Sequence, residues 1–180
     1  LWNVEEAEDF MNKVPSRLRF TGTSCWPSWS VMAKKEFPEF KENISMALTP
    51  MVLTARLVKK EHPDAQVVFV GPCSAKKLEA SRKSVRSDVD FVLTFEELMG
   101  MFVAKNVDFN HLKEKPLENK TSADGRGFAV AGGVAQAVVN AAKPLNPNIE
   151  IKVASAHGLE NCKKMLNDAK AGNYNGHLLK

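Results

Sequence analysis

The sequence lacks an uninterrupted apolar run of about 20 residues, the length that a membrane-spanning helix requires. No secretory signal peptide is visible either. Cysteine is scarce: three are spread through 180 residues, and an odd, widely spaced set does not suit the disulfide framework of a small secreted protein. We therefore expect a protein of a reducing compartment, the cytoplasm, with no membrane partner.

Excess charge of one sign is also scarce, since the formal net charge is only +4. Lysines alternate with acidic residues, as on solvated faces. The one basic run, at residues 82–86, is short and contains no aromatic residue. Surfaces that bind nucleic acids are more basic and often carry aromatic side chains, so we expect no nucleic-acid partner.

What is present is an ordinary globular composition, 44% apolar and 26% charged, in a chain long enough to bury a core. No repeat or linker divides it, so we expect a single domain over residues 1–180. The chain begins at Leu1 without Met and stops at Lys180 without a closing signal. We therefore expect a fragment of a longer chain.

Apolar segments typical of strands alternate with segments typical of helices. The predicted strands are residues 18–21, 66–70, 89–93 and 149–154, and the predicted helices are residues 5–13, 51–61, a helix capped by Thr94 and Glu97, 132–142 and 157–171. Residues 113–127 read as a surface loop. The strand at 66–70 is apolar on both faces, which predicts a central strand covered on both sides. This order predicts a three-layer α/β fold, with a mostly parallel sheet flanked by helices.

Two cysteine segments carry the chemistry, residues 23–29 (TSCWPSW) and residues 71–80 (GPCSAKKLEA). Each places a thiol in a proline-containing loop after a predicted strand. Thiolates are the ligands that hold iron–sulfur clusters, and Lys76 would bring positive charge to an anionic cluster. Ligand sites in parallel sheets lie at the carboxyl ends of the strands, so we expect Cys25, Cys73, Thr94 and His157 to share one edge.

Four segments together resemble a known family. They are residues 23–29, residues 72–80, residues 88–98 (DVDFVLTFEEL) and residues 132–137 (GGVAQA). Their order is similar to that of the iron-only (di-iron) hydrogenase large-subunit catalytic domain, over essentially the whole chain. The resemblance implies one lobe of a two-lobed catalytic domain, and a parent enzyme of the ferredoxin type that reversibly reduces protons to hydrogen.

The resemblance also implies a cofactor, a four-iron, four-sulfur (4Fe–4S) cluster joined to a di-iron subsite that carries carbon monoxide and cyanide. Cys73 stands at the position of a ligand to the four-iron cluster, and Pro72 matches the residue before it. Lys76 matches the lysine that hydrogen-bonds a cyanide. Gly71 replaces the usual methionine, as in divergent members thought to sense hydrogen.

The first cysteine segment departs from the family pattern of two adjacent cysteines. Cys25 falls on the proton-shuttling cysteine and Trp26 on the cluster ligand, although an indole N–H only donates hydrogen bonds. Either Cys25 has taken over ligation, or the cluster lacks a ligand, or the residue has been altered. The other members of the family's proton path match Glu6, Asp9 and Ser45, after a one-residue gap.

A third cysteine motif is expected directly after Leu179, so we expect no cluster bound to this fragment and no hydrogenase activity of the chain by itself. The implied partners are the remainder of the hydrogenase domain, and a ferredoxin-like electron carrier or signalling domains. One alternative is a hydrogen-sensing or redox-regulatory module, which Gly71 and Trp26 favour. Another is an iron–sulfur cluster assembly factor without the di-iron subsite, which Lys76 disfavours.

Several of these residues also have purely structural interpretations. Cys162 is expected to be a small buried apolar residue on the last helix, and His157 to cap that helix rather than bind a metal. Trp26 and Trp29 are expected to anchor the core or a lobe interface. The pair at 132–133 fits either an anion at a helix N-terminus or a close backbone approach.

Overall fold

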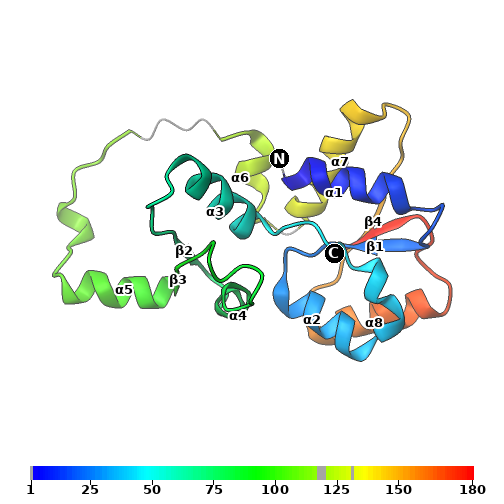
Figure 1. Cartoon of the computed structure of the whole chain (residues 1–180), viewed down its shortest axis with the longest axis horizontal. Helices are drawn as coiled ribbons and strands as arrows, with labels where there is room; N and C mark the ends of the chain where they lie inside the picture. The colour runs from blue at the N-terminus through cyan, green and yellow to red at the C-terminus, as the bar shows by residue number, and fades with distance from the viewer. Residues whose placement is uncertain (1, 117–120, 131) are drawn as a thin grey trace. The chain divides into compact units, whose positions relative to one another are not determined.

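The computed structural model describes residues 2–116, 121–130 and 132–180. Within these residues the chain forms two compact units, each built on a parallel sheet (Figure 1). Unit 1 comprises Leu1–Thr49 and Thr121–Lys180, and unit 2 comprises Pro50–Lys120. The expectation that residues 1–180 form a single domain stays a prediction.

Unit 1 contains a three-stranded sheet between two layers of helices. Its elements are α1 (Trp2–Lys13), β1 (Phe20–Gly22), α2 (Pro27–Glu36), the 3-10 helix η1 (Pro38–Asn43), α6 (Ala123–Gly127), α7 (Gly133–Leu145), β4 (Lys152–Ala154), α8 (Leu159–Lys170) and β5 (His177–Leu179). The strand order is β1-β5-β4, with every pair parallel. Helices α1 and α7 lie on one side of the sheet, and α2 and α8 on the other (Figure 1).

The core of unit 1 explains why its elements form. Phe20 of β1, Leu166 of α8 and Leu179 of β5 are almost fully buried in one cluster with Ile44, which pairs with Gly22 in an isolated parallel bridge. Burial of such side chains contributes about 2 kcal/mol each. Sequence analysis did not predict β5, because only its pairing with two neighbours makes this short segment a strand.

Unit 2 contains a two-stranded parallel sheet, β2 with β3. Its elements are α3 (Pro50–Glu61), β2 (Val68–Gly71), α4 (Ala75–Ala80), β3 (Phe91–Thr94), α5 (Phe95–Ala104) and the 3-10 helix η2 (Phe109–His111). Ion pairs join α3 to the segment before β3, from Arg56 to Asp88 at 2.9 Å and from Lys59 to Asp90 at 2.8 Å.

The structure confirms the α/β class, the parallel pairing and the flanking helices. Two expectations are wrong. The strands form two sheets, one in each unit, rather than a single sheet. The segment at 66–70 is not covered on both faces, since Val68 is 49% exposed; among the described residues β2 has only β3 as a neighbour.

Helix-capping residues in the sequence were good predictors of where helices begin. The expected cap of α5 is present as a capping box, in which the Glu97 amide donates to Thr94 Oγ1 at 3.3 Å and the Thr94 amide donates to Glu97 Oε2 at 2.9 Å. The expected loop at 113–127 instead contains α6, which Ser122 caps by accepting from the Gly125 amide at 3.1 Å. Residues 117–120 of that loop lie outside the described residues.

The glycine pair at the start of α7 has a backbone explanation. Gly132 is the N-cap and has a φ of 83°, in the left-handed region that favours glycine. A Cβ on Gly133 would lie 1.9 Å from the carbonyl oxygen of Gly127. The structure therefore supports the close backbone approach as the reason for this pair.

Candidate functional site

The expected site residues are divided between the two units. Glu6, Asp9, Ser45 and Cys25 lie in unit 1, whereas Pro72, Cys73 and Lys76 lie in unit 2. The expectation of one shared sheet edge is wrong, because each group belongs to its own sheet. Cys25 follows β1 and His157 follows β4, while Cys73 follows β2 and Thr94 ends β3.

A buried carboxyl lies beside the first cysteine segment. The side chain of Glu6 is fully buried on α1. The Ser24 amide donates to Glu6 Oε1 at 3.4 Å, and the Ser24 hydroxyl lies 3.2 Å from the same oxygen. That hydroxyl also lies 2.9 Å from the carbonyl oxygen of Ala47. A hydroxyl has one proton, so when Ser24 donates to Ala47 it can accept from a protonated Glu6.

Burial raises the pKa of Glu6 to about 7, although hydrogen bonds from Ser45 and Ser24 lower it, and the charge of Asp9 adds a small increase. Glu6 Oε2 is buried without a hydrogen-bond partner among the described residues. Desolvation disfavours the ionised carboxylate. Near neutral pH the protonated and ionised forms of Glu6 are therefore close in free energy.

Cys25 follows Ser24, the hydrogen-bond partner of this carboxyl, in the sequence, and it is also buried, at 6% exposure. Its Sγ lies 4.0 Å from Thr23 Oγ1. The cysteine segment is held to the sheet, because the Thr23 amide donates to the carbonyl of Leu179 at 3.0 Å and the Ser45 amide donates to that of Gly22 at 2.8 Å. The thiol is therefore carried by a segment that is hydrogen-bonded to the sheet of unit 1.

Two further residues complete the description of this site. Asp9 lies one turn after Glu6 on α1 and forms an ion pair with Lys13 at 2.6 Å. Ser24 was not among the expected site residues, although it joins Glu6 to the cysteine segment. Its position beside Cys25 was the one sequence signal that could have identified it.

The second cysteine segment runs from the end of β2 through α4 in unit 2. Pro72 is exposed and Cys73 is half-buried. Lys76 is buried, and its Nζ lies 2.8 Å from Oε2 of Glu79, which is also buried. Glu79 therefore compensates the charge of Lys76 within unit 2.

Gly71, at the end of β2, has a local structural role. It is buried, and a Cβ at this position would lie 2.7 Å from the ring of Phe69. The Phe69 ring takes the space that the first carbon of a longer side chain would need. A longer side chain at position 71 would therefore require the Phe69 ring to move.

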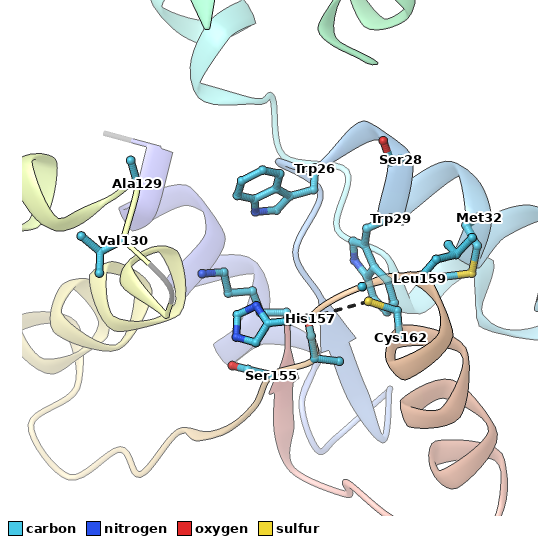
Figure 2. A pocket seen from close by; sticks show the side chains of 13 residues that line it. Trp26, Ser28, Trp29, Met32, Ala129, Val130, Ser155, His157, Leu159 and Cys162 are labelled. Carbon is cyan, nitrogen blue, oxygen red and sulfur yellow. Dashed lines mark hydrogen bonds between the residues drawn. The ribbon is translucent and has the colours of Figure 1, made fainter. Parts of the chain in front are cut away.

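A cavity of about 460 Å³ opens at the carboxyl ends of the strands of unit 1 (Figure 2). Its lining is mostly apolar and includes two indoles, with polar groups from the loops after β4 and β5. The lining residues are Trp26, Ser28, Trp29, Met32, Ala129, Val130, Ser155, Ala156, His157, Gly158, Leu159, Cys162 and Lys180. Its size and apolar lining are those of small-molecule and cofactor sites.

The structural interpretations of the cavity residues had mixed outcomes. Trp29 is buried in the core as expected, and its Nε1 donates to the carbonyl of Thr23 at 3.0 Å. Trp26 is 43% exposed and forms part of the cavity wall. Gly158, not His157, is the N-cap of α8. Cys162 packs partly against the core, and burial raises the pKa of its thiol.

These residues allow a test of whether the implied iron–sulfur cofactor fits. Within residues 2–116, 121–130 and 132–180, no group of three or more His, Cys, Asp or Glu side chains is placed to hold a metal ion. In unit 1 the expected ligand position holds Trp26, which offers no lone pair to iron. In unit 2 Cys73 provides one thiol beside Lys76. The donor set of unit 1 does not fit the cluster.

Comparisons with known proteins agree on one family. The family model for the C-terminal domain of the iron-only hydrogenase large subunit matches residues 1–180. Iron hydrogenase 1 of Clostridium pasteurianum is 29% identical over 93% of this chain and 33% of its own length. A cytosolic Fe–S cluster assembly factor of Phaeosphaeria nodorum is 32% identical over 53% of this chain and 19% of its own length.

Solved structures support the same fold. An apo FeFe-hydrogenase from Chlamydomonas reinhardtii has a TM-score of 0.70 at 19% identity, covering 98% of this chain and 63% of that one. At this identity the likeness shows the fold alone. The chain spans between a third and about half of the length of the first curated relatives, 33% and 52%.

Proposed function

This chain belongs to the family of the iron-only hydrogenase large subunit, C-terminal domain, and we propose that its parent protein reversibly reduces protons to hydrogen. Within that protein, unit 1 carries protons through Glu6, Ser24 and Cys25. The observation that carries this proposal is the buried Glu6 carboxyl hydrogen-bonded to Ser24, the residue that precedes the buried Cys25 in the chain.

The chemistry of these three groups suits proton transfer. A carboxyl whose pKa is about 7 accepts and releases a proton near neutral pH at little cost in free energy. The Ser24 hydroxyl can accept a hydrogen bond from protonated Glu6 or donate one to ionised Glu6. A thiol, whose ordinary pKa is about 8.5, can hold the proton at the next residue. In the parent, the cofactor would supply the electrons and the chemistry of hydrogen.

The proton role is tested in the full-length parent protein with the Glu6→Gln variant. Removing a general acid–base group typically slows a reaction by about 10²–10⁴-fold, so we expect hydrogen evolution to fall by at least about 10²-fold. Glu8→Gln, an exposed change on the same helix, is the matched control and should retain the parent's rate. Equal rates in the two variants would contradict the role of Glu6.

We also propose that the 180-residue chain by itself does not evolve hydrogen, since the described residues contain no complete set of iron ligands. The measurement is gas chromatography of hydrogen after anaerobic incubation with iron, sulfide and a synthetic di-iron complex. Sustained turnover by this chain would contradict the proposal. For the parent we propose a cytoplasmic location, and a ferredoxin-like electron carrier or attached signalling domains as partners.

Two other functions have a specific observation in their favour. A hydrogen-sensing or redox-regulatory role is supported by Trp26 and Gly71, both departures from the family pattern. A role in iron–sulfur cluster assembly is supported by the assembly-factor relatives. Infrared bands of carbon monoxide and cyanide on the full-length protein, with hydrogen turnover, separate the three: catalysts show both, sensors show bands with slow turnover, and assembly factors show neither.

A further inference from the structure

The sheet of unit 2 has an uncovered apolar face. In the parallel register of β2 and β3, Val68 stands beside Phe91, and Val70 follows Val68 on the same side of its strand. Val68 is 49% exposed, Val70 36% and Phe91 56%. Parallel sheets are normally buried on both faces. This face is therefore a surface of the kind that folded proteins cover.

The helix that follows β3 has the same character. Helix α5 contacts both strands (Figure 1), and none of its 10 residues, all of which the structure describes, is buried. Met99 and Met101 point to different sides of the helix, yet they are 46% and 54% exposed. A helix that is apolar all round is normally buried, so α5 also lacks a covering partner within unit 2.

The uncovered side chains of the two strands and of α5 are together called the open surface of unit 2. They are Val68, Val70, Phe91, Phe95, Met99 and Met101. Helix α5 has acidic residues only in its first turn, where Glu97 forms the capping box and an ion pair with Lys77. The rest of α5 offers no charge to a partner, so the chemistry that fits the open surface is apolar.

Strand direction argues against a second copy of this chain as the partner. Two copies related by a twofold axis would place one strand edge against itself, and identical strands related in this way run antiparallel. Every strand pair among the described residues is parallel, and purely parallel sheets are over-represented in proteins. The free edges of β2 and β3 therefore favour one more parallel strand, which a longer chain supplies through a crossover connection.

The relatives are long enough to contain such a segment. This chain spans 33% and 52% of the length of two curated relatives. A parent protein of that length has strands and helices beyond the 180 residues described, and they are held near unit 2 by the chain itself.

We propose that the open surface of unit 2 is the docking surface for an apolar segment of the parent chain outside residues 1–180, which adds a parallel strand to this sheet. The added segment covers the face of Val68 and Phe91 and the exposed sides of α5. This inference goes beyond the proposed function, because it depends on neither hydrogen turnover, nor a cofactor, nor the proton role of Glu6.

The test compares the 180-residue chain with the full-length parent by methionine oxidation. Hydrogen peroxide transfers one oxygen atom to an accessible methionine sulfur, which gives the sulfoxide and water. Peptide mass spectrometry gives the initial rate at each methionine. Met99 and Met101 report on α5, and the buried Met32 and Met51, at 8% and 6% exposure, set the slow reference in both proteins.

The two proteins should differ at α5 and agree at the buried methionines. In the 180-residue chain we expect Met99 and Met101 to be oxidised about tenfold faster than Met51. In the parent we expect their rates to fall to within about threefold of that of Met51. Amide hydrogen exchange of β2 or β3 should also be slower in the parent, because an added strand takes up free backbone groups.

A charged substitution tests the sheet face itself. Val68→Lys should lower the urea midpoint of the parent by about 0.5 M or more, because it buries an unpaired ammonium group there. In the 180-residue chain, where Val68 is exposed, the shift should be less than about 0.2 M. Leu145→Lys is the matched control, an exposed leucine of unit 1 at 46%, and should not distinguish the two proteins.

Each outcome supports or overturns the proposal. Protection of Met99 and Met101 in a monomeric parent, with slower exchange in one of the strands, supports it. Equal oxidation rates in the parent and the 180-residue chain overturn it, as does unchanged exchange in both strands. Protection that increases with protein concentration, with a dimer in sedimentation, assigns the surface to a second copy and also overturns it.

The oxidation and exchange measurements use wild-type proteins, so they decide the matter even if the parent with Val68→Lys does not fold. Loss of hydrogen evolution, or its retention, in the Glu6→Gln test leaves these measurements unaffected. The proposed function and the docking surface can therefore fail independently.

Discussion

The buried carboxyl of Glu6 makes the stability of unit 1 depend on pH in a way that one substitution removes. The pKa of Glu6 is raised from its ordinary 4.5 to about 7 by burial. Each pKa unit corresponds to roughly 1.4 kcal/mol, so keeping the ionised carboxylate buried costs about 3 kcal/mol. Glu6→Gln keeps the size of the side chain and removes the charge.

The sign follows from proton binding. Between about pH 4.5 and pH 7 the folded chain holds a proton on Glu6 that the unfolded chain has lost, so unit 1 loses stability as pH rises through this window. Above about pH 7 the whole penalty is present, and below about pH 4.5 it is absent. We therefore expect the free energy of unfolding of Glu6→Gln, relative to the wild type, to rise by about 3 kcal/mol from about pH 4 to about pH 8.

The assay is urea unfolding followed by tryptophan fluorescence. The three tryptophans of the sequence are Trp2, Trp26 and Trp29, and all three lie in unit 1, so the signal reports this unit. Taking the difference between variant and wild type at each pH cancels the titration of other carboxyl groups. Glu8→Gln, on the exposed face of α1, is the control for a glutamate-to-glutamine change outside the buried site.

Two results would refute the reasoning about Glu6. One is a difference between Glu6→Gln and the wild type that does not change with pH. The other is a difference of the opposite sign, with the variant least stable at high pH relative to the wild type. The first would mean that folding does not shift the pKa of Glu6, and the second that the folded protein stabilises the ionised carboxylate. In either case the proton role proposed for Glu6 would lose its physical basis.

Three further predictions concern stability. Lys76→Met removes the ammonium group that lies 2.8 Å from the buried Glu79 carboxylate, and it should destabilise unit 2 by about 3 kcal/mol. Adding Glu79→Gln should recover part of this loss, measured by far-UV circular dichroism in urea. If the effects of the two substitutions simply add, the pairing is contradicted. Gly133→Ala places a Cβ 1.9 Å from a backbone oxygen, and it should lower the free energy of unfolding by more than about 2 kcal/mol. Gly127→Ala, which has open space at the Cβ position, is the control and should lower it by less than half as much. Asn43→Ala removes the buried 2.7 Å bond to the backbone of β1 and should cost about 1–3 kcal/mol by tryptophan fluorescence; an unchanged midpoint would contradict that contribution.

No helix among the described residues is long and apolar enough to cross a membrane. This agrees with the absence of a long apolar run in the sequence. The location and the partners of the parent protein stay predictions, as do the roles assigned to Cys73 and Lys76.

Features encoded by neighbouring residues could be predicted from the sequence. The start of α3 at Pro50, the capping box of Thr94 and Glu97, and the β-branched strands near β2 and β3 are local signals. Local signals work because a cap or a helical repeat involves residues within one or two turns of each other. The order of four short segments, including the two cysteine segments, likewise indicates the family that the family model matches.

Tertiary structure alone decided the features that depend on residues far apart in sequence. The segment at 177–179 becomes the central strand β5 only because β1 and β4 flank it. Glu6 becomes an acid with a raised pKa because the fold buries its carboxyl, while the hydrogen bonds of Ser24 and Ser45 partly offset that rise. Trp26 and Cys162, which are far apart in the sequence, line the same cavity only in the folded chain. The sequence determined which secondary structure each segment favours. Packing determined which side chains are removed from water, and burial in turn shifts the protonation and the reactivity of those side chains.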